Sequence, residues 1–173
     1  MNTPADFISL SAFGLHDFDV LTFGSQSVPS TPVKFGFQVD VSVHPGISEV
    51  MFGFMNANEG RVKSAVGFGV RIDLERGEIW DVANDSGLVG WLEEPLGCTE
   101  GADGKVLLSL EIERAGSALL PKLQIGGEEW LYPAVRSAEA LELLAVAGCK
   151  PVHGQSAMAV AAFSSPSVWA ERP

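Results

Sequence analysis

Aromatic and acidic side chains beside expected turns are the residues of this chain best suited to chemistry. Aromatic rings offer broad apolar faces, and nearby carboxylate and amide oxygens accept hydrogen bonds, a combination that suits a sugar or a protein partner. Trp91 is expected to be the most exposed tryptophan because it lies in a long acidic stretch without periodicity, whereas Trp80 continues an apolar strand and is expected in the core. The candidate partner-binding residues are Trp91, Trp130, Tyr132, Asp81, Asn84 and Asp85.

The same turn offers a calcium hypothesis. Calcium prefers oxygen ligands, and Asp81, Asn84 and Asp85 are close enough in sequence for one loop to present three of them. The pattern does not match an EF-hand loop, and a run of Asn, Asp, Ser and Gly is more often only a turn. The sequence therefore predicts no cofactor and keeps calcium at these three residues as an alternative.

Paired carboxylates are the one arrangement that could support catalysis. Glu111 and Glu113 share one face of an expected strand, which is the placement that a glycosidase pair needs. Glu113, however, leads directly into a turn, and the histidines (His16, His44 and His153) lack metal-ligand spacing. We therefore predict no catalytic residue, and a carbohydrate-active enzyme built on Glu111 and Glu113 remains an alternative.

The net charge excludes two classes of partner. Eleven Lys and Arg against 22 Asp and Glu give a formal charge of −11, and no basic patch interrupts this balance. Such a surface repels phosphate backbones and anionic lipid, so neither nucleic-acid nor membrane binding is expected. The acid is concentrated between residues 75 and 103, where eight acidic residues are opposed by Arg76 alone. This stretch is interpreted as a solvated rim.

Cysteine content and the chain start bear on the compartment. Cys98 and Cys149 are too few for a disulfide framework, and whether they pair stays open. Residues 1–13 have no basic segment, and polar residues interrupt their apolar ones, so they resemble neither a signal peptide nor a membrane span. We expect a cytoplasmic protein, with a virion as the alternative location.

The elements that must position these side chains are strands. Apolar residues occupy the odd positions from 33 to 43 and the even positions from 66 to 74, and the same alternation returns from 106 to 112. A period of two predicts strands with one face in a core and the other against water or a second layer. With 46% hydrophobic residues in 173, the chain is expected to fold as one all-β sandwich domain spanning residues 1–173.

Two segments depart from this alternation. Residues 137–147 contain strong helix formers, a possible N-cap at Ser137 and Gly148 just beyond, yet they also alternate partly, so a short helix and a buried strand remain equal alternatives. Residues 158–163 are expected to form the last core strand, followed by a tail that packs through Trp169.

Two short segments resemble a known family. Residues 69–80 (GVRIDLERGEIW) are similar to a hairpin of concanavalin A-like sandwiches, closest to the SPRY form, and residues 131–135 (LYPAV) are similar to a Tyr-Pro stretch of the same family. The resemblance implies an antiparallel two-sheet jelly roll whose binding surface is formed by loops and one concave face, and it implies no reaction.

The predicted function follows from the fold and the candidate residues. We expect a non-enzymatic module that binds a protein or a glycan through loops at one end, or through the concave face, of a β-sandwich. A structural subunit of a larger assembly, such as a virion, phage or filament protein, is the alternative, with a homo-oligomer as its simplest form.

Overall fold

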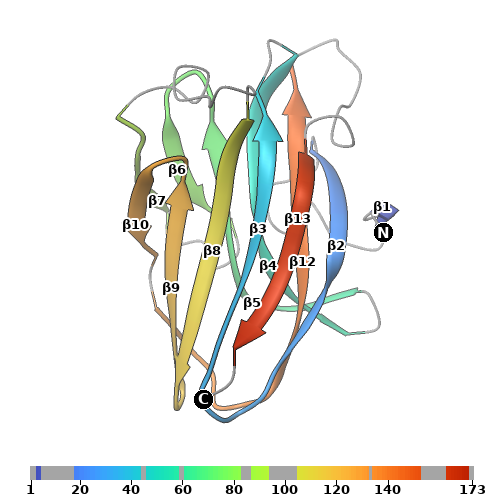
Figure 1. Cartoon of the computed structure of the whole chain (residues 1–173), viewed down its shortest axis with the longest axis vertical. Coiled ribbons are helices and arrows are strands. Elements are labelled where there is room, and N and C mark those ends of the chain that lie inside the picture. The colour runs from blue at the N-terminus through green and yellow to red at the C-terminus, as the bar shows by residue number, and fades with distance from the viewer. Residues whose placement is uncertain are drawn as a thin grey trace.

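The structure is a computed structural model that describes residues 3–4, 18–43, 46–58, 61–82, 87–93, 105–132, 134–152 and 163–171, with backbone alone for 3–4, 56–58 and 61–67. Within these residues every regular element is a β-strand. No described helix is long and apolar enough to cross a membrane. The strands pair antiparallel in two sheets that lie face to face (Figure 1). The predicted all-β, two-sheet sandwich is confirmed.

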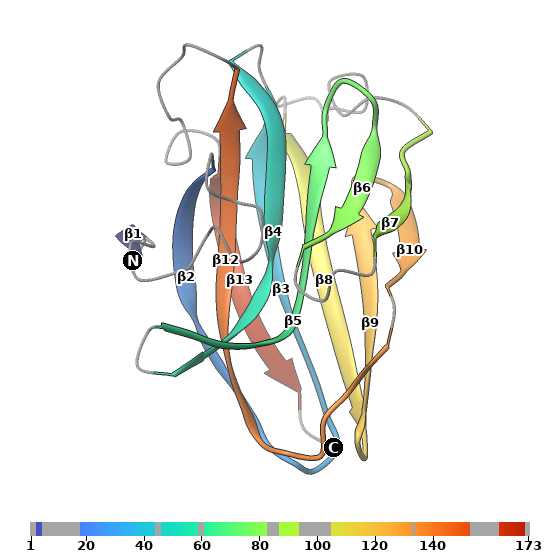
Figure 2. The ribbon, with the colours of Figure 1, turned by 180° about the vertical axis from the view of Figure 1, so that it is seen from behind.

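The first sheet has seven strands and lies in front in Figure 2. Its order is β1 (Thr3–Pro4), β2 (Asp19–Val28), β12 (Leu141–Pro151), β4 (Ile47–Asn58), β5 (Arg61–Asp73), β6 (Glu78–Asp81) and β7 (Leu88–Trp91). The second sheet has six strands and lies in front in Figure 1. Its order is β10 (Glu128–Leu131), β9 (Ala118–Ile125), β8 (Lys105–Ala115), β3 (Val33–Ser42) and β13 (Phe163–Glu171), and β11 (Val135–Arg136) also pairs with β9.

Alternation along the strands builds the core between the two sheets. The inward side chains of β3 and β8 are almost fully buried, as are their counterparts on β4 and β5. Phenylalanines join the layers, since the ring of Phe54 on β4 lies 5.6 Å from that of Phe35 and 6.0 Å from that of Phe37, both on β3. The alternating runs are therefore strands, and their apolar positions face the core as predicted.

β12 shows why residues 137–147 were ambiguous. The helix alternative is wrong, because Leu141–Pro151 forms a strand between β2 and β4 in the middle of the seven-stranded sheet. Leu143 and Ala145 face the main core, while Leu144 and Val146 join a second buried apolar cluster on the sheet's other face. A strand buried on both faces has no polar positions to alternate, so its composition resembles that of a helix.

Two other segments also differ from expectation. The acidic stretch around Trp91 was expected to lack periodic structure, but Leu88–Trp91 is strand β7, and residues 94–104 lie outside the described part. Residues 158–162 of the predicted last strand lie outside the described part. Phe163 begins strand β13, which continues through the predicted tail and pairs with β3 at an edge of the six-stranded sheet. A register shift lies between Ser164 and Ser167 of β13, next to Ser165 with a φ of 50°.

A buried arginine joins three connections at the end of the sandwich where β12 begins. Arg114 is 1% exposed. Its guanidinium donates to the carbonyl oxygens of Pro29 at 2.8 Å, Gly116 at 3.0 Å and Glu139 at 2.7 Å, and also to that of Ser137. Carbonyl oxygens from three separate segments thus surround one fixed cation, which holds these connections together.

Candidate functional site

Charged residues gather on the outer face of the seven-stranded sheet, where β12 ends and β4 begins. Opposed residues of antiparallel strands share a face. Lys150 on β12 is opposed to Glu49 on β4, and Glu49 is opposed to Asp73 on β5. One register further along, Met51 is opposed to Arg71, and Arg71 to Trp80 on β6. The sheet therefore brings together residues that are as far apart in the sequence as Glu49 and Lys150.

Glu49 is the centre of this group. Its Oε1 lies 2.7 Å from Arg71 Nη1 and its Oε2 lies 3.5 Å from Lys150 Nζ, while its side chain is 13% exposed. A carboxylate held by two cations, one on each side, keeps a single orientation because both oxygens have a fixed partner. Glu49 is therefore a preorganised acceptor and not a loose surface charge.

The network continues across β6. The guanidinium of Arg71 lies 5.5 Å from the centre of the Trp80 ring, a distance typical of a cation–π contact. Trp80 Nε1 donates to Glu78 Oε2 at 3.1 Å. Trp80 is partly exposed and lies on the outer face, so its expected place in the core is wrong; Ile79 beside it faces the core instead. Trp80, bonded to Glu78, therefore contacts Arg71 from the strand on the side opposite to Glu49.

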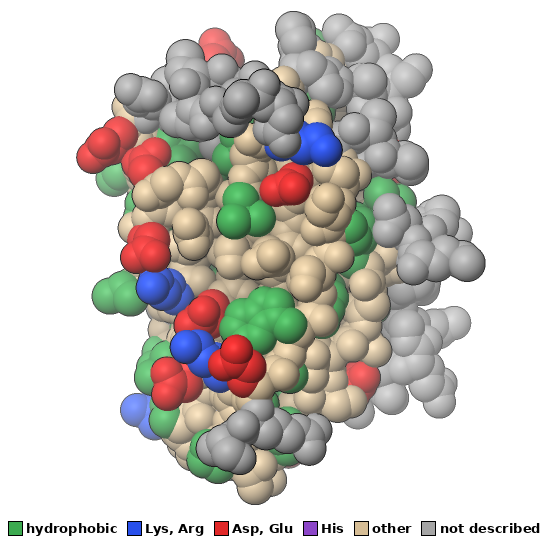
Figure 3. Space-filling model, viewed as in Figure 1, with side chains coloured by type: hydrophobic (Ala, Val, Ile, Leu, Met, Phe, Trp, Pro, Cys, Tyr) green, Lys and Arg blue, Asp and Glu red, His purple; other side chains and the backbone are tan. Residues whose placement is uncertain are grey.

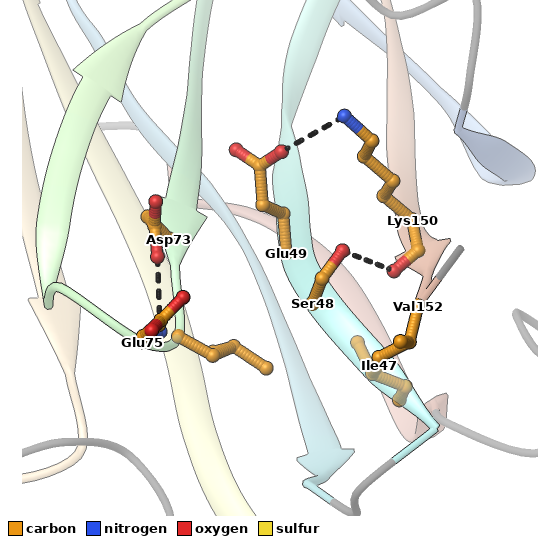
Figure 4. A pocket seen from close by; sticks show the side chains of 8 residues that line it. Ile47, Ser48, Glu49, Asp73, Glu75, Lys150 and Val152 are labelled. Carbon is orange, nitrogen blue, oxygen red and sulfur yellow. Dashed lines mark hydrogen bonds and ion pairs between the residues drawn. The ribbon is translucent and has the colours of Figure 1, made fainter.

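A pocket of about 530 Å³ opens beside Glu49 (Figure 4). Its lining residues are Ile47, Ser48, Glu49, Asp73, Leu74, Glu75, Lys150 and Val152. Glu49 and Lys150 point toward each other from neighbouring strands, and Asp73 lies on the far side (Figure 4). Asp73 Oδ1 accepts from the backbone N–H of Glu75 at 2.9 Å and of Arg76 at 3.0 Å, so this carboxylate is also fixed.

This lining suits a neutral ligand rich in hydroxyl groups. Two fixed carboxylates and the Ser48 hydroxyl oxygen, whose proton is donated to the Lys150 carbonyl, accept hydrogen bonds. The Lys150 ammonium donates them, and Ile47, Leu74 and Val152 supply apolar contacts. Three acidic side chains against one lysine disfavour an anionic ligand.

Trp91 is the predicted residue that the structure places on this face. It is 60% exposed, and it is opposed to Glu78 at the far edge of the same sheet. Trp130 on β10 is partly buried, and its indole covers Gly90, where an added Cβ would lie 2.8 Å from the ring. β7 and β10 therefore meet at one edge of the sandwich, side by side in both views (Figures 1 and 2).

Tyr132 and Asp81 lie inside the protein. They are 4% and 7% exposed, and the Tyr132 hydroxyl donates to Asp81 Oδ1 and accepts from the Gly69 N–H at 3.4 Å. This contact joins the chain after β10 to β5 and β6, so the two side chains support the edge and are not available on its surface. Asn84 and Asp85 lie outside the described residues.

The described residues give the calcium hypothesis no support. In that part of the chain no cluster of three or more His, Cys, Asp or Glu side chains could hold a metal ion. Asp81, the one described member of the predicted ligand set, faces inward to Tyr132.

Glu111 and Glu113 lie on the other sheet. Both side chains share one face of β8, as predicted, and this is the outer face of the sheet. Glu111 Oε1 lies 3.1 Å from Lys34 Nζ. Of the cysteines, Cys149 is buried in β12 and Cys98 lies outside the described residues, so their pairing stays open.

The sequence interpretation missed Glu49, Arg71 and Lys150. Each occupies an outward position of a strand, where a polar residue is unremarkable. Only the pairing of β12 with β4 and of β4 with β5 brings them together, and single-sequence periodicity does not predict which strands become neighbours.

Comparison with known proteins identifies the fold. No protein-family model and no curated protein matches the chain. Among solved structures, lectin I-B4 from Griffonia simplicifolia in its metal-free form aligns with a TM-score of 0.50 at 10% identity, over 90% of this chain and 81% of the lectin. Carbohydrate-binding module CBM66 from Bacillus subtilis aligns with a TM-score of 0.43 at 11% identity, over 78% of this chain and 75% of the module. The potassium-bound carbohydrate recognition domain of Emp46p aligns with a TM-score of 0.42 at 10% identity, over 76% and 70%.

Identities this low establish the fold alone, and the alignment with the lectin carries it. The narrower resemblance to SPRY domains stays a prediction. The chain has a concanavalin A-like jelly-roll β-sandwich fold, as its two short resembling segments imply.

Proposed function

We propose that this protein is a non-enzymatic module that binds a neutral glycan on the outer face of its seven-stranded sheet. The observation that carries the proposal is the Lys150, Glu49, Arg71 and Trp80 network, which holds a carboxylate in one orientation beside a pocket. A lectin of known structure shares the fold, and this supports a sugar as the ligand without determining it.

Each part of a sugar has a counterpart on this face. Ring hydroxyl groups donate to Glu49, Asp73 and Ser48 and accept from Lys150, all of which line the pocket. The apolar face of a neighbouring sugar ring packs on the exposed indole of Trp91, two strands away from Asp73 or about 10 Å by the usual strand spacing. The pocket and Trp91 together fit an oligosaccharide better than a single sugar.

Removal of the Glu49 charge tests the pocket. Glu49→Gln keeps the size of the side chain but removes both ion pairs and weakens the side chain as an acceptor, so we expect the affinity for the sugar to fall at least tenfold, about 1.4 kcal/mol or more. A glycan array identifies the sugar, and isothermal titration calorimetry measures the affinity. The matched control is Glu142→Gln, which alters an exposed acid of the neighbouring strand β12 that is bonded to Ser27. No hit on the array, or unchanged affinity in a folded Glu49→Gln, contradicts the proposal.

Truncation of Trp91 tests the aromatic contact. Trp91→Ala removes a ring that is 60% exposed, so we expect the melting temperature to stay within about 2 °C, because exposed side chains contribute little to stability. The affinity for an oligosaccharide falls about tenfold, while that for the monosaccharide changes little. Leu131→Ala on the adjacent strand β10, 86% exposed, is the control. Equal affinity of Trp91→Ala and wild type for the oligosaccharide would remove Trp91 from the site.

A further inference from the structure

A second aromatic surface lies on the opposite side of the sandwich, on the outer face of the six-stranded sheet. Trp169 on β13 is opposed to Gly36 on β3, and its indole occupies the space above that glycine. A Cβ at Gly36 would lie 2.6 Å from Trp169 Cζ2. The missing side chain lets the indole lie against the sheet instead of standing away from it, while Trp169 stays partly exposed.

Polar side chains extend this surface across four strands in two parallel rows. One row starts at Trp169 and Gly36 and continues through Glu111 on β8 to Lys122 on β9. The adjacent row consists, in strand order, of Ser167, Gln38, Ser109 and Gln124. Three strand spacings make the rows about 14 Å long, the length of a short oligosaccharide rather than of one sugar ring. We call these two rows the Trp169 platform.

The charges of the platform are paired. Lys34 Nζ lies 3.1 Å from Glu111 Oε1, and Lys122 Nζ lies 3.3 Å from Glu129 Oε1. The hydrogen bond from Lys34 to Glu111, followed by the charge of Glu111, raises the pKa of Lys34, with smaller contributions from Glu171 and Glu113. Figure 3 shows this face with hydrophobic side chains bordered by acidic and basic groups, and with large areas of neither type.

The combination points to one class of ligand. An indole offers an apolar face to the C–H groups of a sugar ring, and hydroxyl and amide side chains exchange hydrogen bonds with its hydroxyl groups. Protein interfaces, by contrast, are depleted of charge at their centres, whereas the Lys34 and Glu111 pair lies beside Trp169 with side chains 43% and 38% exposed. We propose that the Trp169 platform is a second binding surface, which takes a linear neutral polysaccharide laid across the strands.

The platform would give the protein two separate glycan-binding surfaces. It faces away from the Glu49 pocket, because the two surfaces are the outer faces of different sheets. One protein molecule could therefore hold two polysaccharide molecules at once, and each polysaccharide would bind several protein molecules. Such multivalent binding strengthens attachment of the protein to the polysaccharide without any new contact. The proposal is separate from the Glu49 pocket, since either surface can bind without the other.

Affinity electrophoresis in gels that contain hydroxyethyl cellulose, xylan or galactomannan tests the platform. We expect at least one of these polysaccharides to retard the wild type. We also expect Trp169→Ala to lower the affinity for it at least tenfold, Trp169→Phe to restore part of it, and Gln38→Ala to lower it severalfold. Gln26→Ala, in β2 of the other sheet, is the control and should migrate like the wild type.

Three results would overturn the proposal. The first is wild-type protein that none of the three polysaccharides retards, whatever the outcome of the glycan array. The second is full retardation of a folded Trp169→Ala. If Trp169→Ala does not fold, full retardation of both single variants Trp169→Phe and Gln38→Ala takes its place. The third is light scattering that shows a wild-type dimer and a Trp169→Ala monomer, which would assign the face to a second copy of the chain. The second result, combined with loss of retardation in Glu49→Gln, would place the polysaccharide in the pocket.

Discussion

Replacement of Arg114 by methionine should lower the free energy of unfolding by about 4 kcal/mol, the scale expected when a buried charged group that is fully hydrogen-bonded is lost. Methionine fills a similar volume but donates nothing, so four carbonyl oxygens from three segments lose their donor at once. Total stabilities of about 5–15 kcal/mol are typical, so this one change would remove a large fraction. The midpoint of urea unfolding should fall, and the melting temperature should drop by about 10 °C.

Two further variants separate the geometry of Arg114 from its charge. Lysine keeps the charge but presents a single ammonium, which cannot reach carbonyl oxygens on three segments, so Arg114→Lys should recover less than half of the loss. Arg136→Met, in the short strand β11, removes an exposed arginine and should change stability by less than about 0.5 kcal/mol. If Arg114→Met were as stable as Arg136→Met, the guanidinium would not hold the connections together.

Removal of the Tyr132 hydroxyl should cost about 2 kcal/mol, which is typical of a lost hydrogen bond to a buried charged group. Tyr132→Phe keeps the ring and its edge contact with Phe68, whose centroid is 6.4 Å away, so the hydroxyl is the only group deleted. Asp81 then keeps its burial but loses this donor. Urea unfolding measures the loss of stability, and tryptophan fluorescence, to which Trp91 and Trp130 at this edge contribute, reports whether the edge loosens.

The double variant Tyr132→Phe with Asp81→Leu provides the control. Because it removes the donor and the buried carboxylate together, it should be more stable than Tyr132→Phe alone. The destabilisation caused by Asp81→Leu is measured both in the wild type and in Tyr132→Phe. If the two values are equal, the two side chains do not depend on each other.

The sequence predicted the strands well wherever one face met the core and the other did not. Residues 33–43 alternate cleanly because β3 has one buried face and one polar face. The same pattern did not distinguish a strand from a helix at β12, since both of its faces are buried and its apolar run has no polar positions that would mark a period of two. The tail around Trp169 was missed as a strand because it lies at an edge, where half of the residues stay exposed and the register is interrupted.

The candidate site was predictable only in part. An exposed aromatic in the acidic stretch pointed to Trp91, which the structure places on the surface. Tyr132 resembled it in the sequence, yet it is buried, because the depth of a residue near a turn depends on how the two sheets close at that edge. The sequence did not predict that Glu49, Arg71 and Lys150 lie together, since their proximity arises from strand pairing over as many as a hundred residues.

The interrupted register of β13 has a consequence for self-association. An edge strand normally exposes an unbroken ladder of N–H and C=O groups that a strand from another molecule can extend. In β13 the left-handed Ser165 bends the backbone, and Pro166 has no N–H to donate, so the ladder is broken midway along the strand. This edge is therefore a poor template for a foreign strand, which protects the protein from open-ended growth into fibres.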